Sequence, residues 1–206
     1  HTSFDETVYK LNLPEEKYMD DAISILADYA MNMLLTPSEI DKERGIILSE
    51  KRARDSIDYR IFYQSIQFEL PGNLVTKRLP IGLEETINSV NREDFLDYYN
   101  TWYRPENMVL VVVGDISPKE WNKAINKAFK SFKAKALVRE KPILTDVGHK
   151  GIKINYIHEK EAAETSIEIG TVVVKKATEM KYKEKRKAEI AEAAAMSILN
   201  DRIREK

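Results

Sequence analysis

One run of apolar residues, Met108 to Val113, limits the folds open to this chain more than any other feature. The run is mostly β-branched and has the length of one strand, far short of the roughly 20 residues of a membrane-spanning helix. A continuous run of this kind is typical of a strand buried on both faces. Helical patterns lie before and after it, over 91–102 and 117–132, so this region is predicted to have an α/β arrangement.

The rest of the chain repeats this mixture of patterns. Apolar residues alternate with polar ones over 7–13, 152–156 and 165–174, and each of these segments is predicted to be a strand. The 3.6-residue period predicts further helices over 20–35, 38–55, 59–70, 84–90 and 183–204.

Residues 133–150 show little periodicity and contain the breakers Pro142 and Gly148, so they are predicted to be a linker. The order of elements before the linker begins again after it. We therefore expect two successive α/β units, one over 1–132 and the start of a second over 151–206. The last helix reaches the end of the chain and the first residue is not Met, so we expect a segment of a longer protein.

Composition excludes several classes of function. The 33 basic and 34 acidic residues leave a net charge of -1, which gives no reason to expect nucleic acid and disfavours a polybasic membrane binder. The chain has no Cys, which excludes thiolate catalysis and cysteine-ligated zinc. Only 7 Gly are present, and neither a Gly-x-Ser-x-Gly elbow nor a Gly-Lys-Ser/Thr phosphate loop occurs.

Two carboxylates in the predicted helix 38–55 are candidates for metal binding. Glu43 and Glu50 are seven residues apart, which places them within about 20° of each other on one helix face. Zinc accepts a carboxylate oxygen, usually beside His nitrogens. The alternative is a solvated face, because the same segment also carries Lys42, Arg44 and Lys51. Spacing alone favours the solvated face.

The three His residues form no zinc motif by themselves. His158-Glu159-Lys160-Glu161-Ala162 resembles a zinc-binding helix motif, but Ala162 stands where the second His belongs. The segment also lies between two predicted strands, so we interpret it as a surface loop. The other two, His1 and His149, are isolated in the sequence.

Four motifs nevertheless resemble those of the pitrilysin/insulinase (M16) metallopeptidases, in the same order along the chain. They are Thr2–Tyr9, Glu43–Glu50, Leu79–Gly82 with Glu85 and Ile87, and Phe95–Met108 running into Val111–Asp115. The second matches Glu-Arg-x-Val-x-x-x-Glu with Ile46 at the Val position, and the fourth contains Trp-Tyr-Arg-Pro-x-Asn-Met. Together they are specific and cover residues 1 to about 132.

The resemblance implies an α+β fold of tandem repeats, each a mostly antiparallel sheet with helices packed on it. The first repeat would lack its N-terminal part, and the second would be incomplete. The resemblance also implies a zinc metalloendopeptidase that hydrolyses peptides or unfolded polypeptides with a zinc-activated water. Its companion repeats would come from the same chain or from a partner subunit.

In the family, an inverted His-x-x-Glu-His helix and a distal Glu bind the zinc. The distal ligand corresponds to Glu50, and Glu43 corresponds to an acid that orients the zinc-binding His residues. The His-x-x-Glu-His motif itself is absent from residues 1–206, which we interpret as truncation. We therefore expect no catalytic residue in this segment and no tight binding of zinc by it alone. The alternative is a non-catalytic M16 homologue that acts as a structural or substrate-binding subunit.

Overall fold

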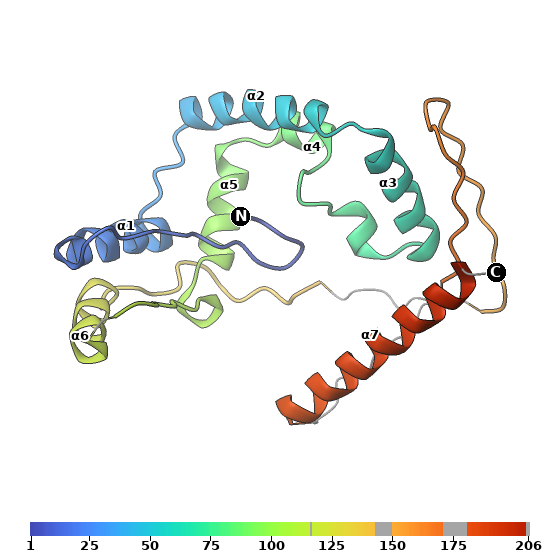
Figure 1. Ribbon diagram of the computed structural model, residues 1–206. Coiled ribbons are helices and arrows are strands. Elements are labelled where there is room, and N and C mark those ends of the chain that lie inside the picture. Colours follow the sequence, from blue (N-terminus) through green and yellow to red (C-terminus); the bar gives the residue numbers. More distant parts are fainter. Residues whose placement is uncertain (116, 143–149, 171–180, 205–206) are drawn as a thin grey trace. The chain divides into compact units, whose positions relative to one another are not determined.

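The computed structural model describes residues 1–115, 117–142, 150–170 and 181–204 (Figure 1). Contacts divide the chain into two units, residues 1–168 and 169–206. The first unit contains α1 (Met19–Met31), α2 (Pro37–Ala53), α3 (Ile57–Glu69), α4 (Glu84–Ser89), α5 (Arg92–Trp102) and α6 (Pro118–Ala128). Short 3-10 turns occur at Glu16–Tyr18, Leu74–Lys77 and Pro105–Asn107. The second unit contains α7 (Tyr182–Arg204).

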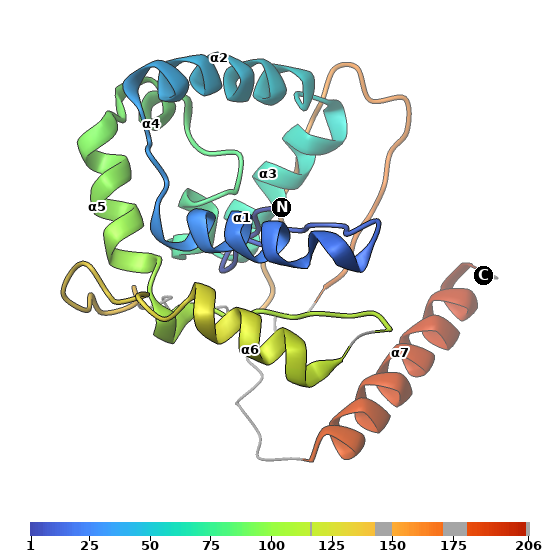
Figure 2. The ribbon, with the colours of Figure 1, turned by 90° about the vertical axis from the view of Figure 1, so that its left-hand side faces the viewer.

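The core of the first unit lies between α1 and α6, which run side by side in both ribbon views (Figures 1 and 2). Ala27, Ala30 and Met31 are buried on one face of α1, where the three- and four-residue spacing of a helix brings them together. Phe129 and Phe132, just after α6, pack against this cluster. Small residues on α1 thus allow large rings to approach closely.

Tyrosine side chains join α5 to α1 and to the N-terminal segment. Tyr99 is buried, and its hydroxyl donates to the carbonyl of Tyr29 at 2.9 Å. Tyr103 packs against Tyr99 with ring centroids 4.5 Å apart, and its hydroxyl shares a 2.5 Å hydrogen bond with that of Tyr9. The aromatic residues of α5 therefore serve packing, although Tyr98 in the same run is exposed.

The predicted fold class is wrong. Within the described ranges the structure contains helices and no strand or sheet, and pairing is limited to one isolated antiparallel bridge between Thr2 and Thr7. A strand requires a neighbour that accepts and donates its backbone hydrogen bonds. Residues 109–113 form no backbone hydrogen bond to any described residue. The α+β arrangement with a mostly antiparallel sheet is therefore not present.

The run Met108–Val113 also differs from its prediction in burial. Val109, Val111 and Val113 are 88%, 73% and 90% exposed, whereas the residues between them are less exposed. The period of two is present in the exposure of the side chains, but burial on both faces is not. The sequence of an extended segment determines which side chains lie on each of its two faces. Burial of both faces also requires that other elements pack against each of them.

Two predicted segments lie partly outside the described residues. These are the linker 133–150, of which 143–149 are not described, and the strand 165–174, of which 171–174 are not described.

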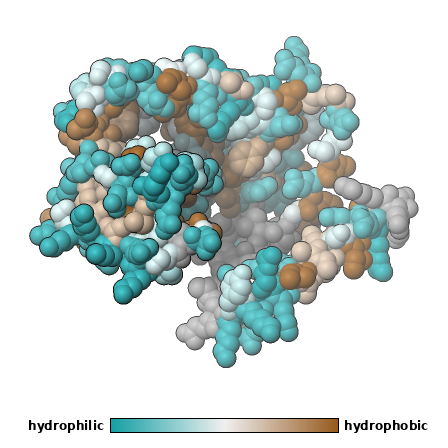
Figure 3. All heavy atoms as spheres, turned by 60° about the vertical axis from the view of Figure 1, so that its left-hand side comes forward, coloured by the Kyte–Doolittle hydropathy of each residue, from teal (hydrophilic) through white to brown (hydrophobic). Residues whose placement is uncertain are grey.

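Hydrophobic side chains are scattered in small groups over the otherwise mostly hydrophilic face in Figure 3. No helix in the described part of the chain is both long and apolar enough to cross a membrane.

Candidate functional site

Helix α2 carries both candidate metal-binding carboxylates. It begins at Pro37, whose fixed φ and missing N–H suit the first helical position, and Thr36 before it has an extended backbone. Glu39 in the first turn and Lys51 in the last turn complement the helix dipole. Ile40 is the one buried residue of α2. The helix is therefore mostly polar, and little apolar contact sets its orientation.

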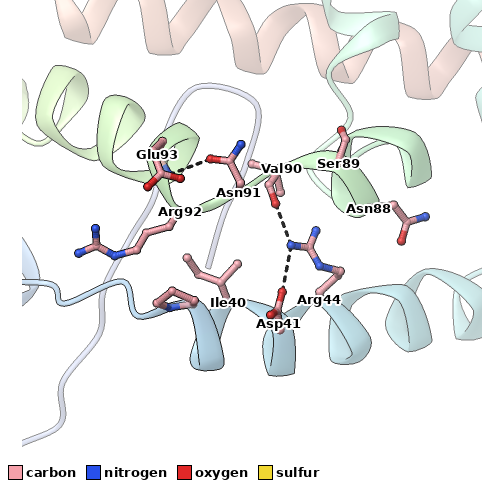
Figure 4. Close-up of a pocket in the computed structure, with 10 residues that line it drawn as sticks. Ile40, Asp41, Arg44, Asn88, Ser89, Val90, Asn91, Arg92 and Glu93 are labelled. Atoms are coloured by element: carbon pink, nitrogen blue, oxygen red, sulfur yellow. Dashed lines mark hydrogen bonds and ion pairs between the residues drawn. The ribbon is translucent and has the colours of Figure 1, made fainter.

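Two cations of α2, Arg44 and Lys51, bind backbone carbonyls around α4, and Figure 4 shows the contacts of Arg44 with Val90 and Asp41. Arg44 donates from Nη1 to the carbonyl oxygen of Ile87, and from Nη2 to that of Val90 at 2.7 Å. Its Nη2 also lies 3.3 Å from Oδ1 of Asp41. Lys51 donates from Nζ to the carbonyl oxygen of Gly82 at 3.0 Å. Arg44 and Lys51 therefore attach α2 to both ends of the short helix α4.

Glu43 and Glu50 are both exposed on α2. The carboxylate of Glu50 pairs with the guanidinium of Arg54, one turn further along, and the Glu50 side chain is 46% exposed. Exposed pairs of this kind contribute little free energy, so Arg54 is an exchangeable partner. A carboxylate in this position is accessible to a ligand that approaches from outside α2.

The donor set on α2 fits one position of a zinc site and lacks the remaining ligands. No group of three or more His, Asp and Glu side chains gathers closely enough to hold a metal ion in the described part of the chain. A zinc site needs three or four protein ligands, commonly including His nitrogen. His158 stacks on Tyr156 instead, with ring centroids 6.4 Å apart, and His149 lies outside the described residues.

The loop that contains His158 has a structural role that sequence reasoning missed. Glu159 accepts hydrogen bonds from Nε of Arg60 at 3.1 Å and from Nε2 of Gln64 at 3.3 Å. Nη2 of Arg60 also pairs with Glu161 at 3.2 Å. The hydrogen bond to Asp55, and after it the hydrogen bond to Glu159, raise the pKa of Arg60. Because about a hundred residues separate the partners, no local pattern could have indicated the contact.

A cavity of about 360 Å³ lies between α2 and the junction of α4 with α5 (Figure 4). Two arginines line it, and both bind backbone carbonyls. Arg44 binds as described above, and Arg92 donates from Nε to the carbonyl oxygen of Leu35 at 2.9 Å. The cavity is thus bordered by two cations that already donate to backbone carbonyls, and we assign it no ligand.

Comparison with known proteins relates the sequence of this chain to one family of peptidases. A family model described as "Peptidase M16 inactive domain" matches residues 89–206, and one described as "Insulinase (Peptidase family M16)" matches residues 1–65. A zinc protease PQQL-like protein of Arabidopsis thaliana is 28% identical over 98% of this chain and 21% of its own length. A probable zinc protease PqqL of Haemophilus influenzae is 34% identical over 58% of this chain and 13% of its own length.

A solved structure supports the same relationship. The crystal structure of the first half of the periplasmic protease PqqL from Escherichia coli aligns with 64% of this chain and 28% of that chain, with a TM-score of 0.58 and 27% identity. The chain spans only a minor part of each of these relatives. The relatives are named as proteases, and the two family models together match 1–65 and 89–206. This chain therefore belongs to peptidase family M16.

Proposed function

We propose that this chain supplies Glu50 as one zinc ligand of a metalloendopeptidase that hydrolyses peptides or unfolded polypeptides. The observation that carries the proposal is the exposed carboxylate of Glu50 on α2, a helix that is itself attached to α4 by Arg44 and Lys51. The names of the relatives, which include zinc proteases, support the choice of metal. The whole protein would supply the nitrogen ligands.

The residues of this chain would act by binding and orienting. Glu50 would exchange its contact with Arg54 for the metal, which costs little because the pair is exposed. Glu43 lies on the same face of α2 as Glu50. It would accept a hydrogen bond from a zinc-binding His and fix the orientation of that His. Bound zinc would supply Lewis-acid polarisation of the scissile carbonyl. Substrate and companion repeats, whether in the same chain or in a partner subunit, belong to the same proposal.

The domain division is part of the proposal as well. Residues 1–132 and 151–206 would belong to successive repeats, with 133–150 as the linker between them. Leu137 and Val138 are exposed within that linker, which makes its described part accessible to a protease. Limited proteolysis should cleave within 133–150 before it cleaves within α1 or α5. Early cleavage inside those helices would contradict the division.

The test of the zinc ligand is Glu50→Gln in the full-length protein, which keeps the shape of the side chain and removes its charge. We expect zinc content and peptidase activity to fall together, by about 10-fold or more in metal affinity. Glu39→Gln is the matched control, because Glu39 is an exposed carboxylate at the other end of α2. Unchanged zinc content in Glu50→Gln would overturn the assignment.

A second candidate is a non-catalytic M16 subunit that binds substrate or supports the assembly. The match of residues 89–206 to a model described as the inactive domain favours it. This candidate predicts that the purified full-length protein binds an unfolded polypeptide without cleaving it, and that Glu50→Gln leaves the affinity for that polypeptide unchanged. Metal-dependent cleavage that is lost in Glu50→Gln would favour the peptidase.

A further inference from the structure

The cations and the carboxylates of α2 repeat with the same spacing. Glu43 and Glu50 are seven residues apart, and so are Arg44 and Lys51. Each cation directly follows one carboxylate, so the cation pair lies about 100° around the helix from the carboxylate pair. The contacts of the cations therefore determine which way the carboxylates face. We propose that Arg44 and Lys51 are positioning residues for Glu50, an inference that rests on the proposed function.

Helix α2 needs such positioning because its own packing is weak. Ile40 is its single buried residue, and Ile47 and Leu48 on the same side are only partly buried, so apolar contact defines the rotation of α2 weakly. Two attachments seven residues apart, about 10 Å along the axis, restrict both rotation and tilt. If α2 turned about its axis by the angle between two successive residues, the face that carries Glu43 and Glu50 would move by about 100°.

The acceptors of these cations belong to one short segment. Val90 is the C-cap of α4, and Ile87 lies in its last turn, where backbone carbonyls lack partners within the helix. A cation at this end also complements the helix dipole. The Arg44 side chain is 20% exposed, so its hydrogen bonds are more shielded from water than an ion pair on the surface.

The other attachment uses the turn before α4. Gly82 has φ +79°, a conformation that favours glycine, and its carbonyl oxygen accepts from Lys51. A Cβ at this position would lie 3.4 Å from Cγ1 of Ile87. The turn at Gly82 thus fixes where its carbonyl lies, and Arg44 and Lys51 enclose α4 between them.

The experiment uses Arg44→Met, Arg44→Lys, Lys51→Met and Lys51→Arg in the full-length protein, with Arg52→Met as the control. Arg52 is exposed on the same helix, and its guanidinium donates to the hydroxyl of Ser49 at 3.0 Å. The first readout is amide hydrogen exchange over 82–91 in metal-free protein, which should become faster in the two Met variants. The second is zinc affinity, which should fall about 10-fold in Arg44→Met. Lys51→Arg should retain both values, because it keeps a donor for Gly82.

Arg44→Lys separates positioning from charge. Lys keeps the positive charge but lacks the planar guanidinium that donates to the carbonyls of both Ile87 and Val90. The zinc affinity of the Arg44→Lys variant should therefore lie between that of wild type and that of Arg44→Met. Faster exchange with wild-type zinc affinity would make Arg44 and Lys51 merely structural and overturn the inference. Unchanged exchange in both Met variants would overturn it too. Retention of zinc in Glu50→Gln would instead contradict the proposed function, whatever the exchange rates.

Discussion

Helices α1 and α2 are neighbours in the sequence and have similar lengths, yet different forces orient them. α1 has five buried residues, which are Ala22, Ile23, Ala27, Ala30 and Met31. α2 has only Ile40 and is attached instead by Arg44 and Lys51 to backbone carbonyls. Apolar packing gains free energy in proportion to buried area, whereas hydrogen bonds exchange for water and gain little net. We therefore infer that α1 contributes more stability than α2 and that α2 presents an exposed polar face.

The largest effect is expected from a cavity in α1. Ile23 is 2% exposed, and Ile23→Ala removes buried methyl and methylene groups. This substitution should lower the free energy of unfolding by about 2–4 kcal/mol, measured by urea denaturation. Ile25→Ala on the same helix is the control, because Ile25 is exposed. Equal losses in the two variants would contradict the view that α1 is oriented by its buried face.

The apolar face of α1 could be predicted from sequence, but its end could not. The stripe containing Ile23 and Ala30 follows the helical period, and both residues are buried. The helix was predicted to run to Leu35 but ends at Met31. Side chains distant in sequence bind the carbonyls beyond this point, because Lys135 donates to that of Met31 and Arg92 to those of Leu34 and Leu35. Leu35 itself has φ +47°. No local pattern contains these contacts.

The candidate site shows the same limit. Helical spacing predicted that Glu43 and Glu50 share one face of α2, since this follows from periodicity alone. The contacts of Arg44 and Lys51 with α4 required the fold, because their acceptors are backbone carbonyls, which every residue has. The strands predicted over described residues are absent for a related reason. Alternation in a segment defines its two faces but does not provide the neighbouring strand that completes a sheet.

The N-terminus of α5, which directly follows the Val90 carbonyl bound by Arg44, is capped by a side chain. The side-chain oxygen of Asn91 accepts hydrogen bonds from the backbone N–H groups of Glu93 and Asp94. In return, the backbone N–H of Asn91 donates to the carboxylate of Asp94. Asn91→Ala should cost about 1–2 kcal/mol in the free energy of unfolding, measured by thermal denaturation. Asn91→Ser should recover most of it. Asn88→Ala, at an exposed position in α4, should be close to neutral, and a similar loss there would contradict a capping role.

Alkaline pH tests the tyrosine contacts that join α5 to the N-terminal segment. Burial, and then the hydrogen bond with Tyr9, raise the pKa of Tyr103 above its usual value. The neutral phenol is therefore favoured in the folded state. Its contribution is fully present below about pH 10, the usual pKa of Tyr, and is lost as pH rises toward the folded-state pKa.

Tyr103→Phe should accordingly lower stability by about 1 kcal/mol at neutral pH and lose less stability than wild type above about pH 10. Urea denaturation across this pH range measures both effects. Tyr98→Phe is the control, because Tyr98 is exposed and lies in α5, the helix that ends directly before Tyr103. An alkaline loss that is identical in wild type and Tyr103→Phe would exclude Tyr103 as its source.

The smallest effect is expected from the ion pair between Glu39 and Lys42 in α2, and it separates two kinds of polar contact. Nζ of Lys42 lies 3.6 Å from Oε2 of Glu39, and the two side chains are about 70% exposed. Water and salt screen such a pair, so a double-mutant cycle of Glu39→Gln and Lys42→Met should give a coupling below about 0.5 kcal/mol. Arg44, by contrast, is mostly buried and binds carbonyls that have no other partner in α4. A coupling above about 1 kcal/mol for the exposed pair would mean that surface charge, and not attachment to the backbone, orients α2.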